Sequence, residues 1–166
     1  MTTSSHGDDR DTGNAAQRRI YVASSWRNLD QPGIVAALRA DGHEVYDFRN
    51  PRPGDTGFAW SEIDPDWLGW TPEPFRDLLD HPIAVGGFDS DFAAMERADT
   101  FVLALPCGRS AHLEAGWAIG AGKPTAILLH EDKFEPELMY RMADLVAVTV
   151  EEVRAWLAAL VLECAA

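Results

Sequence analysis

Cysteine, basic side chains and long apolar runs are all scarce in this sequence of 166 residues. Its two cysteines, Cys107 and Cys164, are too few for a disulfide framework or a metal cluster. No apolar run approaches the roughly 20 residues that span a bilayer, and the N-terminus has no apolar core of the kind a secretory signal needs. We therefore expect a cytoplasmic protein with no membrane partner and no structural metal.

Basic residues number 14 against 27 acidic ones, which gives a formal net charge of −13. This charge repels a phosphate backbone, so we expect no nucleic acid polymer as partner. A single anionic nucleotide can still bind where local basic groups outweigh the background. The 46% of hydrophobic and 25% of charged residues are ordinary for a globular chain, and the length suits one domain with a substantial core.

The order of apolar segments predicts the fold class. Residues 1–17 are small and polar and predict a disordered tail, so the single domain is expected over residues 18–166. Short apolar runs then alternate with helical patterns, which predicts an α/β fold of the flavodoxin or Rossmann type, with a mostly parallel five-stranded sheet flanked by helices. The expected strands are residues 20–23, 44–48, 100–105, 125–129 and 145–148, and the expected helices are residues 32–41, a short one from 72, 88–98, 110–120 and one that Thr149 caps.

Residues 49–70 form a long irregular segment with several prolines and glycines. Such a segment inside a compact domain is usually functional or disordered. Its aromatic residues argue against disorder, and Trp60, Trp67 and Trp70 favour the small core of a lid over a platform for a base.

Ligands of parallel α/β sheets bind at the carboxyl ends of the strands. The loops after Ala23, Phe48 and Leu105 are therefore expected around one crevice. In the first of these loops, Arg27 and Asn28 are interpreted as solvated residues, with Arg27 near enough to meet a phosphate.

Residues 106–117, which hold the strongest candidates for catalysis, follow the expected central strand and begin a helix. Gly108 permits a tight turn, the free amides of a helix start form an anion site, and Arg109 and Ser110 add donors. Glu114 lies in the first turns, where the helix dipole favours its ionised form, and shares a helix face with Ser110. Glu114 is thus a candidate nucleophile; the alternative is that it only satisfies the dipole. His112 is expected to point elsewhere on the helix.

From about Arg19 to Asp144 the chain resembles the nucleoside 2-deoxyribosyltransferase family. The most specific piece is the strand–turn–helix that carries Glu-x-Gly-x-Ala at residues 114–118. Further matching residues, in the family's order and at similar spacing, are Ile20-Tyr21, Trp26, Asp91 with Asp99, Gly122-Lys123 and Leu138-Met139.

In that family the matching glutamate attacks the anomeric carbon of the sugar, so the resemblance implies this role for Glu114. It also implies that Tyr21 orients the nucleophile, that Trp26 lies against the base and that Asp91 lies near the base. Without the resemblance, Tyr21 and Trp26 have the alternative reading of core aromatics. Asp91 and Asp89 have the alternative reading of helix caps.

The chemistry suits a carboxylate without a cofactor. Departure of the base leaves an oxocarbenium-like sugar, which a carboxylate can trap covalently before a second base or water releases it. The leaving base needs a proton or a hydrogen bond, for which Asp91 or Asp89 are the candidates. Cys107 lies near this site, but no His and Asp are spaced to make it a nucleophile.

The sequence departs from the family at positions that contact the 5′ end of the substrate's sugar. Family transferases carry an aspartate six residues before the glutamate, where this chain has Gly108 with Arg109 and Ser110. The family asparagine that reaches a neighbour's 5′-hydroxyl falls on Glu137, with Met139 close by. The resemblance therefore implies substrate contacts from these residues and a homodimer or higher homo-oligomer.

The expected substrate is a nucleoside or nucleotide, and the expected reaction is transfer of its sugar to another base or to water. One alternative is a nucleoside 5′-monophosphate N-glycosidase, which Arg109 and Ser110 would suit and Glu137 would oppose. Cleavage of NAD by the same carboxylate chemistry is a more distant one. A non-catalytic nucleotide-binding sensor is the alternative outside enzymes.

Overall fold

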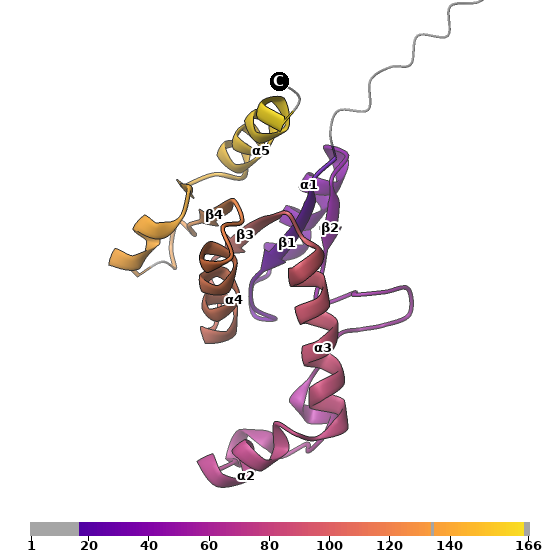
Figure 1. Ribbon diagram of the computed structural model, residues 1–166. Coiled ribbons are helices and arrows are strands. Elements are labelled where there is room, and N and C mark those ends of the chain that lie inside the picture. The colour runs from indigo at the N-terminus through magenta and orange to yellow at the C-terminus, as the bar shows by residue number, and fades with distance from the viewer. Residues whose placement is uncertain (1–16, 134, 165–166) are drawn as a thin grey trace, which may run out of the picture.

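The computed structural model describes residues 17–133 and 135–164 and shows one sheet of five parallel strands between layers of helices (Figure 1). The strand order β2-β1-β3-β4-β5 is that of flavodoxin-like folds, and it confirms the predicted fold class. The order reverses between β1 and β3, which is where such folds place their ligands. The strands are β1 (Arg19–Ala23), β2 (Glu44–Tyr46), β3 (Thr100–Ala104), β4 (Thr125–Leu128) and β5 (Leu145–Ala147).

Two helices cover each face of the sheet, and a fifth lies beyond it. Side chains of a strand point alternately to its two faces, so Ile20 and Val22 enter one apolar core and Tyr21 and Ala23 enter the other. The helices at residues 31–40 and 150–164 pack into the core that contains Ile20 and Val22. The helices at residues 82–97 and 109–120 pack into the core that contains Tyr21 and Ala23. The helices are α1 (Gln31–Ala40), α2 (Pro72–Leu78), α3 (Pro82–Arg97), α4 (Arg109–Gly120) and α5 (Val150–Cys164).

Two sequence predictions concern the tail and the membrane. The predicted disordered tail lies outside the described residues, apart from Gln17. Among the helices of the described ranges, none combines the length and the apolar character needed to cross a membrane.

The helix expected over residues 88–98 begins six residues earlier, at Pro82. The His81 imidazole accepts a hydrogen bond from a first-turn amide at 3.2 Å, and proline is favoured at a first helical position. Two adjacent glycines lower the helix propensity of this stretch, and packing overrides them. Asp89 and Asp91 therefore lie inside the helix, and the reading of either as its cap is wrong.

The final helix begins as predicted. The Thr149 hydroxyl accepts a hydrogen bond from the Glu152 amide at 3.2 Å. The Glu152 carboxylate accepts from the Val148 amide at 2.8 Å, one residue before the cap. The predicted capping box is thus present in a shifted form, in which both side chains still satisfy free amides of the helix start.

Residues 56–81, called the arm below, form a separate lobe at the end of α3 (Figure 1). The arm is ordered around its own aromatic cluster, in which the Trp60 ring makes edge contacts with three others. The predicted small aromatic core is confirmed for Trp60 and Trp70. Trp67 makes no ring contact with another described residue and does not belong to it. The Trp70 indole nitrogen also donates to Asp64 at 2.5 Å. The ring centroids lie 4.8 Å (Phe58), 5.5 Å (Trp70) and 5.7 Å (Phe75) from that of Trp60.

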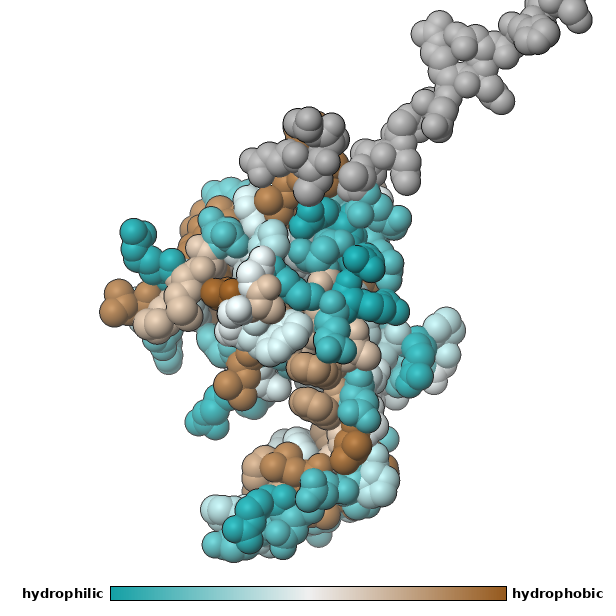
Figure 2. Space-filling model, viewed as in Figure 1, coloured by the Kyte–Doolittle hydropathy of each residue, from teal (hydrophilic) through white to brown (hydrophobic). Residues whose placement is uncertain are grey.

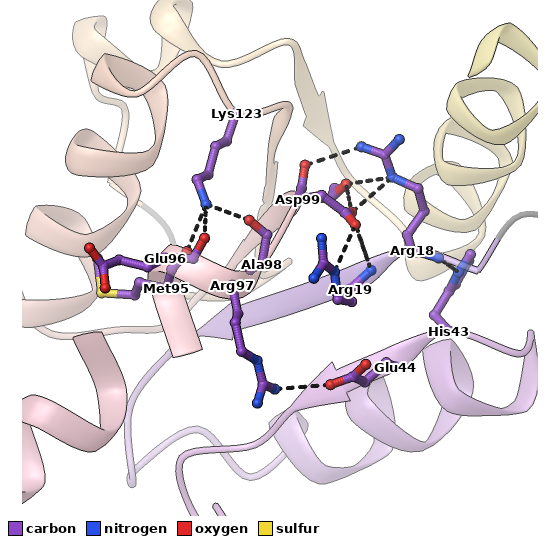
Figure 3. Close-up of polar contacts among 11 residues, drawn as sticks. Arg18, Arg19, His43, Glu44, Met95, Glu96, Arg97, Ala98, Asp99 and Lys123 are labelled. Carbon is purple, nitrogen blue, oxygen red and sulfur yellow. Dashed lines mark hydrogen bonds and ion pairs between the residues drawn. The ribbon is translucent and has the colours of Figure 1, made fainter. Parts of the chain in front are cut away.

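A polar cluster holds the amino edge of the sheet, opposite the predicted crevice (Figure 3). The Asp99 carboxylate accepts from the Arg19 amide at 3.2 Å and pairs with Arg18 at 3.1 Å. The Lys123 ammonium donates to three carbonyls at the end of α3. Asp99 and Lys123 both belong to the family resemblance, and here they anchor the helix that carries Asp91. The three carbonyls are those of Met95 (2.9 Å), Glu96 (2.8 Å) and Ala98.

Candidate active site

Three aromatic rings stack across the neighbouring strands β2, β1 and β3. The register pairs Tyr21 of β1 with Tyr46 of β2 on one side and with Phe101 of β3 on the other. The ring centroids are 5.2 and 5.1 Å apart, and Tyr21 is 1% exposed. Burial, and then the charge of Glu114, raise the pKa of Tyr21 far above its usual value, so its hydroxyl stays a proton donor. Stacking on both faces fixes where that hydroxyl points.

The Tyr21 hydroxyl lies near the carboxylate of Glu114 on α4, and its hydrogen-bonding interaction acts to lower the pKa of that carboxyl. The Ser110 hydroxyl donates to the same carboxylate at 3.2 Å, which confirms that the two residues share a helix face. Burial, reinforced by the charge of Asp91, raises the pKa of Glu114 to about 7, although both hydrogen bonds act to lower it. Near neutral pH the side chain therefore exchanges between a neutral acid and an oriented carboxylate.

Asp91 on α3 is the second carboxyl group of the site. Its Oδ1 accepts a hydrogen bond from the Tyr46 hydroxyl at 2.7 Å. Burial raises the pKa of Asp91, the bond from Tyr46 lowers it, and the charge of Asp55 raises it further. Sequence reasoning missed Tyr46. The available signal was a phenol at the carboxyl end of a strand next to the one that carries Tyr21.

Asn28 ties the loop after β1 to the end of β3. It is 1% exposed, and its amide donates to the Leu105 carbonyl and the Ser24 hydroxyl, each at 3.0 Å. The interpretation of Asn28 as a solvated loop residue is therefore wrong, whereas Arg27 is exposed as expected. A buried polar group needs such partners, and here they hold together the two strand ends that flank the site.

Arg49 clamps the same loop and was not singled out in the sequence. Its guanidinium donates to three backbone carbonyls and lies 5.3 Å from the centre of the Trp26 ring. Trp26 meets Phe48 edge-on at 5.4 Å and is 47% exposed, so the alternative reading of Trp26 as a core aromatic is wrong. Its contact with a base stays a prediction. The carbonyls belong to Ser25 (3.0 Å), Trp26 (2.9 Å) and Asn28 (2.8 Å).

The start of α4 is open. Gly108 has a φ of −93°, and an added Cβ would meet no atom within 4 Å. Glycine is therefore compatible with this turn, but neither the backbone angle nor the available space requires it. Arg109 is exposed, and within the described parts of the chain no ion pair joins it to Glu137. Glu137 instead lines a pocket of about 500 Å³ with Cys107. Its approach to a neighbouring subunit stays a prediction, because the structure is that of a single chain.

His112 packs beside this pocket, away from Glu114. Its imidazole lies 3.4 Å from the Cys107 sulfur and 3.0 Å from the Tyr140 hydroxyl, and the rings of His112 and Tyr140 stack. Burial, and then the charge of Glu114, raise the pKa of Cys107 to about 12. Cys107 is thus a neutral thiol, although the structure places a histidine, His112, beside its sulfur where the sequence predicted none.

Two predicted site residues lie outside the cluster. Asp89 is exposed on α3, and its carboxylate makes no hydrogen bond or ion pair with another described residue. Met139 is 59% exposed in the 3-10 turn Leu138–Met142. Within residues 17–133 and 135–164, no three His, Cys, Asp or Glu side chains gather so as to hold a metal ion.

The chain matches no family model and no curated protein. Among solved structures it is similar to a CMP N-glycosidase of Clostridium botulinum, BcmB, with a TM-score of 0.47 and 18% sequence identity. The similarity covers 84% of this chain and 98% of that one. At this level of likeness, the roles of individual residues rest on their own contacts.

Proposed function

We propose that this protein cleaves the N-glycosidic bond of nucleosides, with Glu114 as the nucleophile. The observation that carries the proposal is the geometry of the Glu114 carboxylate. Two hydroxyl groups, of Tyr21 and Ser110, orient it at the carboxyl edge of the sheet, and the charge of a second carboxyl group, Asp91, acts on it. Two carboxyl groups in one site are what glycoside cleavage with a covalent intermediate requires.

In the proposed first step, a Glu114 oxygen attacks C1′ of the sugar while the bond from C1′ to the base nitrogen breaks. The electron pair of that bond leaves with the base, and Asp91, in its protonated form, supplies the proton or hydrogen bond that the departing nitrogen needs. Tyr21 keeps donating to the carboxylate and so holds its orientation without removing its charge. In the second step, a nitrogen of another base or a water oxygen attacks C1′, its proton passes to Asp91, which gave up its own in the first step, and Glu114 leaves as a carboxylate.

Charge at the sugar's 5′ end favours free nucleosides over 5′-monophosphates. The pocket beside the start of α4 is lined by Asp132, Glu135 and Glu137, with Lys133 as one basic neighbour. A phosphate would meet more negative than positive charge there. We further propose that a second copy of the chain contributes to this end of the site. A strictly monomeric protein in sedimentation velocity would contradict that part.

The test is incubation with a panel of ribo- and deoxyribonucleosides and their 5′-monophosphates, with and without a second free base, read by chromatography. Base exchange would indicate transfer, and base release would indicate hydrolysis. Glu114→Gln should remove turnover while ligand binding persists. Glu73→Gln, the same change at an exposed site on α2, is the matched control and should behave as wild type. Binding without turnover in the wild type would identify a sensor and overturn the proposal.

A further inference from the structure

The arm and the loop after β1 enclose a pocket of about 770 Å³, here called the aromatic pocket. The loop contributes Ser25, Trp26 and Arg27, and the arm contributes the opposite wall. Figure 2 shows the arm as a lobe whose hydrophobic side chains are turned toward the body of the molecule. Chief among the residues of the arm wall are Phe58, Trp60, Trp67 and Leu68.

Among the exposed large apolar residues of the arm, Trp67 and Leu68 are the two that line the aromatic pocket. Trp60 and Trp70 are engaged in the arm's own ring cluster. Trp67 is 36% exposed and Leu68 is 83% exposed, although both line the aromatic pocket. Exposed large apolar side chains that line a concave surface are typical of a binding site.

A smaller pocket lies beside the aromatic pocket and reaches Asp91 of the candidate active site. A pocket of about 230 Å³ is lined by Asp91 and Ser90 from α3. Gly57, Phe58 and Glu62 line both pockets, so these three residues form the partition between them. The smaller pocket falls below the range of about 300–1,000 Å³ typical of drug-sized ligands, and the aromatic pocket falls inside it.

Close backbone contacts fix the partition in place. Gly57 has a φ of +74°, and an added Cβ would collide with the Phe48 carbonyl oxygen and lie 3.1 Å from Trp26. An added Cβ on Gly87 of α3 would lie 2.8 Å from Phe58. The arm is thus packed tightly at both ends of the partition, against the loops after β1 and β2 and against α3, and the aromatic pocket is a formed part of the fold.

We infer that the aromatic pocket binds an apolar or aryl substituent of the leaving base, and that the substrates are nucleosides whose base carries such a group. This inference rests on the proposed function. The base ring would lie in the smaller pocket beside Asp91, and its substituent would extend past Phe58 between the rings of Trp26 and Trp67. Flat aromatic walls favour a planar group, and Arg27, Ser61 and Glu62 offer partners for its heteroatoms.

The test compares matched pairs of free bases by titration calorimetry: adenine with N6-benzyladenine, and cytosine with N4-benzylcytosine. In at least one pair, the benzylated base should bind at least about 10-fold more tightly than its parent base. A difference of that size is what one good aromatic contact contributes. Trp67→Ala and Leu68→Ser should bring that ratio close to one and leave the affinity for the parent base nearly unchanged. Leu162→Ser, at a 71% exposed leucine on α5, is the matched control and should keep the ratio.

Equal binding of both members of each pair would overturn the inference, as would a preference that persists in both arm variants. Leu68→Ser keeps the test valid if Trp67→Ala fails to fold. If the arm variants instead dissociate an oligomer in sedimentation velocity and no preference is seen, the pocket wall is a contact between copies, and the inference fails. Turnover of the corresponding nucleosides is scored separately: tight binding of benzylated bases without turnover would defeat the proposed function and leave the pocket assignment standing.

Discussion

Glu114→Gln should make the protein more stable at alkaline pH while it removes activity. An exposed glutamate titrates near 4.5, and the pKa of Glu114 in the fold is about 7. Because the folded value is the higher one, the stability from this group is complete below pH 4.5 and is lost as the pH rises through about 7. The ionisation of Glu114 thus costs about 1 kcal/mol of folding free energy at pH 5 and about 3 kcal/mol at pH 8.

The variant keeps the shape of the side chain and can still accept the Tyr21 hydrogen bond, but it does not titrate. Its free energy of unfolding relative to wild type should therefore rise by about 2.5 kcal/mol between pH 5 and pH 8. For a chain of this size that corresponds to about 5–10 °C in the melting temperature.

Urea denaturation and thermal melts at the two pH values measure this difference, with Glu73→Gln as the control that should show no such trend. A stability difference that does not change with pH would refute the elevated pKa of Glu114, and with it the burial and the Asp91 charge that cause it. Activity of the variant near that of wild type would separately remove Glu114 from the mechanism.

Four further outcomes are expected. Tyr21→Phe should slow turnover by about 10- to 1000-fold, less than Glu114→Gln does, because one oriented donor is lost and the packed ring remains; if the variant unfolds, Tyr21 is structural. In wild type, kcat/KM should increase about tenfold per pH unit as the pH rises toward 7, because only ionised Glu114 attacks; a flat profile from pH 5 to 7 would contradict this. Nucleosides should outperform their 5′-monophosphates, and Glu137→Ala should weaken nucleoside turnover; a monophosphate preference that Arg109→Ala abolishes would reverse the assignment. Asn28→Ala should destabilise the fold by about 1–3 kcal/mol in urea, because buried carbonyls lose their donor, and an unchanged midpoint would count against its bridging role.

The strands of the sheet and the residues at its carboxyl edge could be predicted from the sequence. Continuous apolar runs such as residues 100–104 are typical of buried parallel strands, and their alternation with helical patterns leaves few topologies. The position of Glu114 in the first turns after the central strand, with Ser110 four residues earlier, followed from helix geometry alone. Such features are local in the chain, and local spacing determines them.

Contacts between distant segments needed the tertiary structure. Tyr46 reaches Asp91 across 45 residues of sequence, and only the pairing of β2 with β1 places that phenol beside Tyr21. Asn28 looked like a solvated loop residue because its acceptor at Leu105 lies 77 residues away.

The helix start at Pro82 and the placement of the arm depended on packing in the same way. The Phe58 ring packs against Gly87, where a side chain would leave no room for it. No local sequence pattern reveals this contact. The sequence by itself determined the sheet, its order of elements and the candidate nucleophile, since periodicity and strand–helix alternation are properties of neighbouring residues. The tertiary structure decided the pKa of Glu114 and the pockets around it, because burial and charge at a point depend on every segment that packs there.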